Sequence, residues 1–417
     1  MHGDFTRNTF DAAKQYSRVL KQQGRVDLDA DWNEQTAILL HYMRALTRDL
    51  FGAAAGPAEG CGFKIDKDGA NLTIGKGRYY VGGIPVKNEG LTLFAAQVGN
   101  YHQDDFKPPV GGNVVYLDVW EQFVSYVQDD NMREVALGGP DACGRARIMW
   151  QVRLLDTGAR LEDLPMIGTG QLSAKAIENT RDDQACVIAP DSRYRGAENQ
   201  LYRVEIHSGG TAGGGATFKW SRDNGSVVFP IRTLKGSTVE VEHLGRDAAS
   251  GLNVGDCVEI IDDAMAAHDG VGVLAQVTAV DRDELSVTLA LPTGAPILAY
   301  PTPSIDLHPL LRRWDHQGGQ SSPGAGLEVI PVEWLALEDG IQINFSKNGT
   351  FKAGDYWLIP ARVATGDVEW PESPGNPDLP LRKYPDGPHH YYAELAVIAA
   401  NLVITDKRKT ATRLVPS

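Results

Sequence analysis

The sequence predicts a mainly β protein made of several antiparallel sandwiches or barrels, preceded by an N-terminal α-helical hairpin. Up to about residue 56, apolar residues recur at helical spacing. After Gly60 the chain changes to short β-branched and aromatic segments separated by Gly and Pro. Dipeptides that favour tight turns lie between several of these segments, namely Asp68-Gly69, Gly82-Gly83 and Asn224-Gly225. No regular alternation of strands and helices is visible, so a parallel sheet is not expected.

Residues 1–56 are expected to form two helices with a short connection. The first helix has one weakly apolar face and stops at Gly24-Arg25; this face consists of Phe10, Ala13, Ser17 and Leu20. The second begins at a capping box formed by Asp31 and Glu34 and ends at Phe51-Gly52. Its stripe, at spacings of four and three, consists of Trp32, Thr36, Leu39, Met43, Leu46 and Leu50. Such a stripe needs a partner, in its own domain or in another subunit.

The alternate acidic residues Asp27, Asp29 and Asp31 raise the question of a calcium loop. A helical calcium loop has Gly at its sixth position and Glu at its twelfth. Here these positions hold Trp32 and Ile38, so the sharp turn and the bidentate ligand are both missing. The stretch is therefore interpreted as the start of a helix, and no metal is expected.

Three β regions are expected after the helical hairpin. They cover residues 61–165, 170–305 and 306–417, and the second contains a small barrel-like insertion near 235–300. In the third region, a proline-rich arm spans 370–388. Its prolines at every third position favour polyproline II; they are Pro371, Pro374, Pro377 and Pro380. We expect the arm to dock on its own β body or on a neighbour by burying Trp370, Leu379, Leu381 and Tyr384.

Composition excludes several classes of protein. The formal net charge is −14, which repels a phosphate backbone and makes nucleic-acid binding unexpected. No stretch reaches the roughly 18 apolar residues of a membrane span, and the N-terminus has no basic or apolar leader. The four cysteines are far apart, so we expect them to be reduced and buried rather than metal ligands; they are Cys61, Cys143, Cys186 and Cys257.

No motif predicts an enzyme or a cofactor. The Gly-rich loop 208–217 lacks the lysine of a phosphate-binding loop. Adjacent His389 and His390 would point to opposite faces of a strand. Glu205 and His207 share a strand face, which allows an acid–base pair but favours a cross-strand polar contact. Acidic doublets suit solvated turns better than a glycosidase pair; they are Asp104-Asp105, Asp129-Asp130 and Asp262-Asp263.

Seven tryptophans are spread through the β regions, mostly beside polar or charged residues. They are Trp120, Trp150, Trp220, Trp314, Trp334, Trp357 and Trp370. Such residues can fill the core, lie at subunit contacts or stack on sugars, and we favour these roles in that order.

Several sequence blocks are distributed along nearly the whole chain, at residues 3–35, 116–122, 133–153, 199–210, 216–228, 311–317, 334–345, 354–362 and 389–398. Together these blocks resemble a bacterial family encoded beside contractile, phage-tail-like injection systems. In addition, GRYYVGGIPVKNEG (77–90) is similar to short elements of phage baseplate proteins. The resemblance implies a baseplate, fibre or cap component of such a particle.

The leading hypothesis is therefore a structural subunit, not an enzyme, that binds other subunits of a tail-like particle and forms a homo-oligomer. It would be made and assembled in the bacterial cytoplasm and could be released as part of an extracellular particle. The alternative is a glycan-binding or glycan-cleaving module of a fibre. Candidate assembly residues lie on the second helix and on the proline arm; they are Trp32, Leu39, Met43, Leu46, Leu50, Trp370, Leu379, Leu381 and Tyr384.

Overall fold

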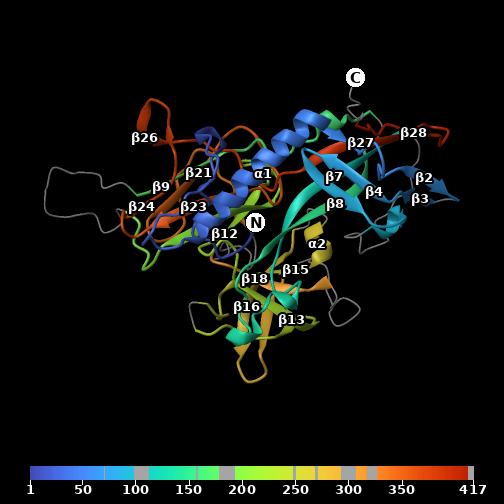
Figure 1. Ribbon diagram of the computed structural model, residues 1–417. Helices are drawn as coiled ribbons and strands as arrows, with labels where there is room; N and C mark the ends of the chain where they lie inside the picture. The colour runs from blue at the N-terminus through green and yellow to red at the C-terminus, as the bar shows by residue number, and fades with distance from the viewer. Residues whose placement is uncertain are drawn as a thin grey trace, which may run out of the picture. The chain divides into compact units, whose positions relative to one another are not determined.

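The computed structural model describes residues 1–69, 71–97, 112–155, 158–177, 193–247, 250–267, 271–292, 307–316 and 326–411 (Figure 1). Contacts group the chain into two compact units, each built from three separate segments. Unit 1 consists of Met1–Arg7, Phe123–Arg145 and Ile167–Pro388. Unit 2 consists of Asn8–Gln122, Ala146–Met166 and His389–Ser417. The predicted mainly β, antiparallel fold class is confirmed in both.

Unit 2 contains three antiparallel sheets. The first has the order β1 (Ala54–Ala55), β4 (Gly77–Val81), β5 (Ile84–Asn88), and the second has the order β2 (Ile65–Asp68), β3 (Asn71–Ile74), β6 (Thr92–Leu93). The third has the order β28 (Ile404–Asp406), β27 (Tyr391–Ile398), β7 (Asn113–Val124), β8 (Arg145–Leu155). Along β5, Ile84 and Val86 are buried while Pro85 and Lys87 are exposed, as alternation predicts. These inward residues join Leu117 and Leu395 in one apolar core.

A sandwich in unit 1 packs a larger sheet on a smaller one. The larger has the order β19 (Leu327–Glu328), β12 (Thr217–Ser221), β10 (Gln200–Ser208), β23 (Tyr356–Arg362), β24 (Asp367–Val368). The smaller has the order β20 (Leu335–Ala336), β21 (Ile341–Phe345), β9 (Leu172–Ala176), and β11 (Gly210–Thr211) pairs with β22 (Thr350–Phe351). Phe345 packs between Phe218 and Trp357, with ring centroids 5.1 and 6.1 Å away. The aromatic core thus holds the two sheets together.

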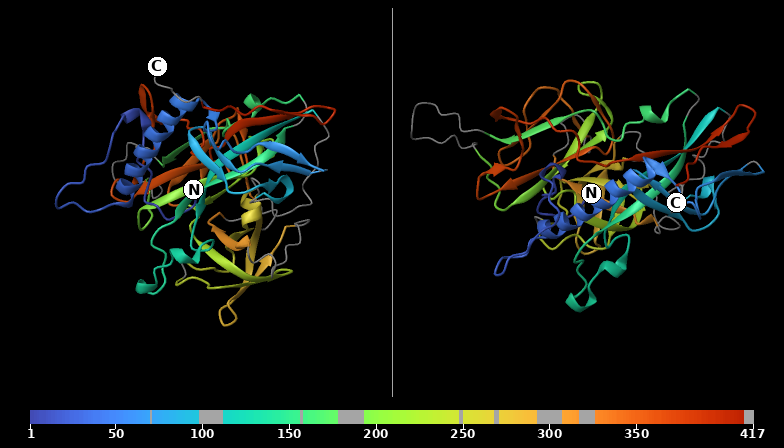
Figure 2. Two further views of the ribbon diagram at one scale, coloured as in Figure 1. Left: turned by 45° about the vertical axis from the view of Figure 1, so that its right-hand side comes forward. Right: turned by 45° about the horizontal axis from the view of Figure 1, so that its top comes forward.

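Unit 1 also contains a closed six-stranded barrel, whose yellow to orange strands gather in both views of Figure 2. Its order is β13 (Val228–Lys235), β14 (Thr238–Val241), β17 (Ser286–Ala290), β16 (Val273–Asp281), β15 (Cys257–Ile261), β18 (Leu310–Trp314). The short helix α2 (Asp263–Ala267) follows β15. Strands β14 to β17 fall in the segment 235–300 where a barrel-like insertion is predicted, of which residues 248, 249, 268–270 and 293–300 lie outside the described residues. The barrel has its own apolar core.

The helix α1 (Asp29–Phe51) differs from its prediction at its start. It begins two residues before Asp31, and its N-cap is Leu28, which makes no side-chain capping bond. The predicted capping box is therefore wrong, because Glu34 accepts a hydrogen bond from Thr9 at 2.5 Å instead. Asp29 and Asp31 still lie in the first turn, where their negative charges interact favourably with the positive end of the helix dipole. The predicted end is confirmed, since Gly52 has φ 73° and donates to the Arg48 carbonyl.

The first predicted helix, and with it the helical hairpin, is wrong. Residues 8–23 contain only a 3₁₀ helix, Ala12–Lys14, which Asp11 caps and Gln15 ends with φ 53°. An isolated short helix is marginal in water unless its apolar face packs. Here Tyr16 and Leu20 are exposed, so no packing supports a helix. Other 3₁₀ helices are Phe94–Ala96, Asp130–Met132, Val135–Leu137 and Leu161–Asp163.

The proline arm is a β-hairpin rather than polyproline II. β25 (Glu372–Ser373) pairs with β26 (Asn376–Pro380) around a turn where Gly375 has φ 80°. Residues between the prolines supply the amides, and Leu381 donates to the Pro371 carbonyl at 2.8 Å. The arm docks on its own unit, because Lys383 and Leu172 exchange two backbone hydrogen bonds. Within the described residues, no helix has both the length and the apolar character needed to cross a membrane.

The turn between β4 and β5 positions α1 within unit 2. A Cβ at Gly83, where φ is 84°, would lie 2.5 Å from the carbonyl oxygen of Arg44 in α1. Gly69, in the turn between β2 and β3, has φ 60° but an open surround. Both turns lie at the predicted Gly dipeptides. Only the turn at Gly83 also contacts the backbone of α1.

We predict that Gly83→Ala destabilises unit 2 more than Gly69→Ala does. Both variants place a side chain at positive φ, which costs about 1 kcal/mol. Gly83→Ala adds overlap with the helix, for a further 1–3 kcal/mol by order of magnitude. Urea unfolding of the two variants measures the difference. Equal losses of unfolding free energy would show that the close approach does not hold α1.

Candidate functional site

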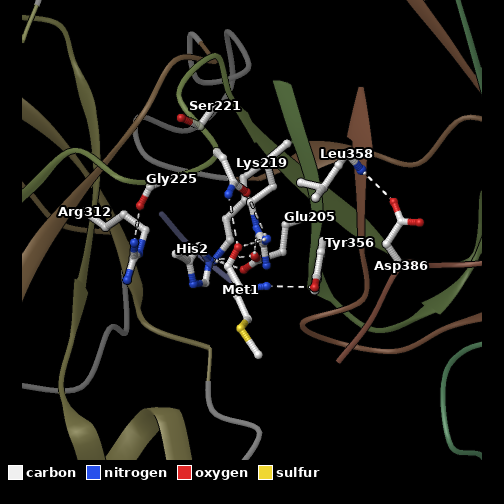
Figure 3. Close-up of polar contacts among 12 residues, drawn as sticks. Met1, His2, Glu205, Lys219, Ser221, Gly225, Arg312, Tyr356, Leu358 and Asp386 are labelled. Carbon is white, nitrogen blue, oxygen red and sulfur yellow. Dashed lines mark hydrogen bonds and ion pairs between the residues drawn. The ribbon is translucent and has the colours of Figure 1, made fainter. Parts of the chain in front are cut away.

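Within the described part of unit 1, a group of charged side chains is buried where the sandwich meets the barrel (Figure 3). Lys219 on β12 lies 3.2 Å from Glu205 on β10 and 2.6 Å from Glu259 on β15. The side chains of these three residues are 3%, 8% and 2% exposed, respectively. We call Arg203, Glu205, Lys219, Glu259 and His2 the ionic cluster.

On the barrel side, the Glu259 carboxylate is held by two hydrogen bonds and by its ion pair with Lys219. It accepts hydrogen bonds from the indole Nε1 of Trp314 and from the Gly272 amide, each at 2.9 Å. The Lys219 ammonium lies 4.5 Å from the centre of the Trp314 ring. The carboxylate, the ammonium and the ring thus form one charge-compensated contact between β12, β15 and β18.

The start of the chain takes part on the sandwich side. His2 Nε2 lies 2.9 Å from Glu205 Oε2, and Arg203 Nε donates to the same oxygen at 2.5 Å. The Arg203 guanidinium lies over the Tyr356 ring, 3.7 Å from its centre. Asn224 donates to the Gly3 carbonyl at 2.8 Å, which fixes the backbone behind His2.

Burial and neighbouring charges oppose each other at the two carboxylates. Burial alone would raise the pKa of Glu205, but Arg203, Lys219 and His2 hold that pKa well below its usual value. At Glu259, Lys219 likewise outweighs burial and lowers the pKa. Burial lowers the pKa of His2 well below its usual value. Both carboxylates are therefore ionised and His2 is neutral near pH 7.

The geometry favours a structural role for the cluster. A general acid or base must reach a substrate, whereas Glu205, Lys219 and Glu259 are enclosed by protein. Glu205 pairs with Lys219 directly across the two strands, so the cross-strand contact predicted for Glu205 is confirmed. His207 is not its partner: its Nδ1 is buried and has no hydrogen-bond partner.

Sequence reasoning missed Arg203, Lys219 and Glu259. The available signal was charge inside apolar strands: Lys219 stands between Phe218 and Trp220, and Glu259 stands in CVEII. Inward charges of this kind must pair because burying an unpaired charge is costly. The sequence does not identify the partners, since they lie on other strands.

The described histidines and cysteines show no metal geometry. Across the described ranges, no group of three or more His, Cys, Asp or Glu side chains could hold a metal ion. His390 is buried, lies 2.8 Å from Asp118 and stacks on Trp120, whereas His389 is exposed. The two adjacent histidines thus differ in burial, and His390 is a packed residue of unit 2.

The expected burial of the cysteines is correct only in part. Cys257 is buried, Cys61 is half-buried and Cys143 is exposed. Cys143 lies in the loop 141–144 before β8, where its Sγ accepts from Arg145 at 2.9 Å. Cys186 and the doublet Asp104-Asp105 lie outside the described residues.

The tryptophans are mostly core residues. Trp120, Trp220, Trp314 and Trp357 are between 0% and 5% exposed. Trp334 is more open and lies under the Lys175 ammonium, 4.7 Å from its ring centre. Four of the seven indoles are therefore too enclosed to stack on a sugar, which agrees with the core role favoured from the sequence.

The predicted stripe of α1 is a continuous exposed surface. We call Trp32, Thr36, Leu39, Met43, Leu46 and Leu50 the α1 seam. Trp32 is 71% exposed, and the other apolar members are 52–64% exposed. The opposite side carries the buried residues Ala30 and Ile38. The structure thus brings all five predicted helical assembly residues onto one open face.

Of the four assembly residues predicted on the proline arm, two are half-buried and two are exposed. Trp370 and Leu381 are half-buried, and the Trp370 indole donates to the Leu381 carbonyl at 2.8 Å. Leu379 and Tyr384 are exposed, so their predicted burial is wrong. The reason is the hairpin, which turns Leu379 outward on a two-stranded sheet.

Comparison with known proteins gives a family but no characterised relative. The model of a family of unknown function, DUF6519, matches residues 1–169 and 165–408. No curated protein and no solved structure matches the chain.

Removing the shared ammonium should destabilise unit 1 strongly. Lys219→Met leaves Glu205 and Glu259 without their common cation, and breaking a buried ion pair costs about 3–5 kcal/mol. Lys235→Met, at an exposed position on the barrel strand β13, is the matched control and should change stability by less than about 0.5 kcal/mol. Chemical unfolding followed by tryptophan fluorescence measures both. Similar stabilities would mean that the cluster is not a stabilising contact.

His207 should make unit 1 sensitive to acid. Burial, followed by repulsion from Lys219, lowers the pKa of His207 to about 4. The unfolded chain therefore binds more protons between pH 6.5 and 4, and the free energy of unfolding falls as pH drops through that window, by roughly 3 kcal/mol. His207→Gln should flatten this dependence, whereas the exposed His41→Gln should not. Unfolding free energies measured from pH 7 to 4 test this; parallel curves for all three proteins would contradict it.

Proposed function

We propose that this chain, which belongs to the DUF6519 family of unknown function, is a structural subunit of a contractile, phage-tail-like injection particle. It acts by binding other subunits and not by catalysing a reaction. On this proposal the chain is made and assembled in the bacterial cytoplasm and can leave the cell as part of the particle.

The exposed α1 seam is the observation that carries the proposal. From the exposed fractions of its side chains and their usual sizes, the seam with Leu40 and Tyr42 leaves on the order of 700 Å² open to solvent. The largest apolar patch on a typical monomer is about 300–600 Å². One partner's share of a standard protein interface is about 800 Å². The area therefore suits a surface that another subunit covers.

The ionic cluster also supports this proposal, because its geometry favours a structural role over catalysis. Its carboxylates and cations neutralise one another inside unit 1 and offer no charged group to a substrate. A subunit that transmits force or fixes neighbours needs a body that keeps its internal layers in register, and directed buried contacts serve that purpose. The particle context itself comes from the resemblance of the sequence blocks.

A glycan-binding or glycan-cleaving role has less support. It requires a groove with several open indoles around a carboxylate pair. Trp120, Trp220, Trp314 and Trp357 are enclosed, and the buried carboxylates Glu205 and Glu259 share a lysine. Neither feature favours this alternative.

Replacing two seam residues should exclude the chain from particles. Leu39→Ser with Leu46→Ser removes apolar contact area while leaving the fold intact, because both side chains are exposed. The matched control is Leu20→Ser with Val26→Ser, two exposed apolar residues outside α1. Particles purified from the producing bacterium are analysed by mass spectrometry and negative-stain imaging. The seam variant should be depleted at least tenfold and the control retained; wild-type incorporation of the seam variant would refute the proposal.

A further inference from the structure

We infer that α1 pairs with α1 of a second copy of this chain as an antiparallel two-stranded coiled coil. Its twofold axis crosses the helix pair at the level of residue 41 along α1. This inference rests on the proposed function, because it names the occupant of the same surface. The α1 seam is the part of the molecule on which it is built.

The spacing of the seam is that of a coiled coil. Its residues follow one another at intervals of 4, 3, 4, 3 and 4, which is the alternation of a and d positions in a heptad. Trp32, Leu39 and Leu46 take d positions, and Thr36, Met43 and Leu50 take a positions. Apart from Leu40 and Tyr42, the exposed large apolar residues of α1 are confined to a and d positions, which is the narrow stripe by which one helix packs on another.

Contacts within unit 2 leave the seam free for that partner. Ala30 and Ile38, the buried residues of α1, take b and c positions on the far side of the helix. Arg44, another b position, pairs with Glu121 at 2.8 Å and lies against Gly83. The helix is thus fixed through one side, and the seam lies on the other.

The order of side chains favours the antiparallel direction. In that arrangement Trp32 meets Leu50 of the partner subunit, and Thr36 meets Leu46 of the partner subunit. The central layers join Leu39 to Met43 of the partner subunit. Each layer then pairs residues of complementary volume. A parallel pair would instead place two Trp32 indoles in one layer and two Thr36 hydroxyls in the next.

The acidic first turn and the helix dipole favour the same direction. The first turn carries Asp29 and Asp31, whereas the last turn carries both Arg48 and Asp49. Antiparallel packing keeps the two acidic first turns apart and opposes the two helix dipoles. Leu40 and Tyr42 flank the seam near the axis and widen its apolar centre. A parallel pair would set the two acidic first turns side by side.

Sedimentation equilibrium of the full-length chain tests whether a second copy of the chain covers the α1 seam. The wild-type protein should be a dimer. Met43→Glu, which puts a charge in a central layer, should raise the dimer dissociation constant roughly 100-fold. His41→Glu adds the same side chain to the same helix at an exposed position off the seam and should leave the dimer intact. A monomeric wild type, or equal weakening by both variants, would overturn the inference.

Disulfide mapping tests the direction. The double variant Trp32→Cys with Leu50→Cys, made in a Cys143→Ser background, places one thiol near each end of the seam. Antiparallel pairing should give peptides in which position 32 of one chain is linked to position 50 of the other. Links between two copies of position 32, or between two copies of position 50, would overturn the antiparallel arrangement. Both substituted side chains are exposed, so the fold should survive.

The two proposals fail in different ways. A wild-type monomer whose seam variants are still excluded from particles would overturn the second copy as the occupant, and the seam would then bind a different subunit. A dimer whose seam variants enter particles normally would overturn the proposed function and leave the helix pairing in place.

Discussion

The arrangement within unit 1 depends on one ammonium group shared by two carboxylates. Glu205 belongs to the sandwich and Glu259 to the barrel, and Lys219 contacts both. The sandwich and the barrel each have their own apolar core, so the cluster fixes how they are oriented within unit 1 rather than adding hydrophobic burial. Hydrogen bonds from Trp314 and Gly272 fix the orientation of Glu259. Misplacing any of these groups would leave a buried charge without its partner, which is more costly than a poorly packed methyl group.

The charges and the apolar side chains of this protein depart from their usual distribution in opposite ways. Arg203, Glu205, Lys219 and Glu259 are buried, whereas Trp32, Leu39 and Met43 are open to solvent. Buried charges hold a body in one conformation because they tolerate few alternatives. An exposed apolar stripe lowers its free energy only when another surface covers it. The buried charges belong to unit 1 and the exposed stripe to unit 2, and both features suit the proposed role in assembly.

The first fifty residues serve both features. Met1–Arg7 belong to unit 1, where His2 contacts Glu205, and the chain then enters unit 2, where α1 presents the seam. Removing the whole N-terminal segment would therefore alter the buried cluster and the exposed helix together. Point substitutions on α1 separate the two, because the seam side chains make no contribution to the core of unit 2.

The sequence by itself determined what depends on near neighbours in the chain. Alternation gave the β class, Gly dipeptides marked the turns at Gly69 and Gly83, and the heptad spacing of α1 and its end at Gly52 followed from local rules. The tertiary structure decided what depends on distant contacts. The segment 8–23 contacts α1 through Thr9 and Val19 but leaves Tyr16 and Leu20 exposed, so no apolar face supports a helix there, and the proline arm is a hairpin because its amides find partners. Lys219 and Glu259 are 40 residues apart, and His2 and Glu205 are 203 apart. Such pairs form only when folded layers bring them together, and the same packing leaves the seam exposed while it buries Ile38.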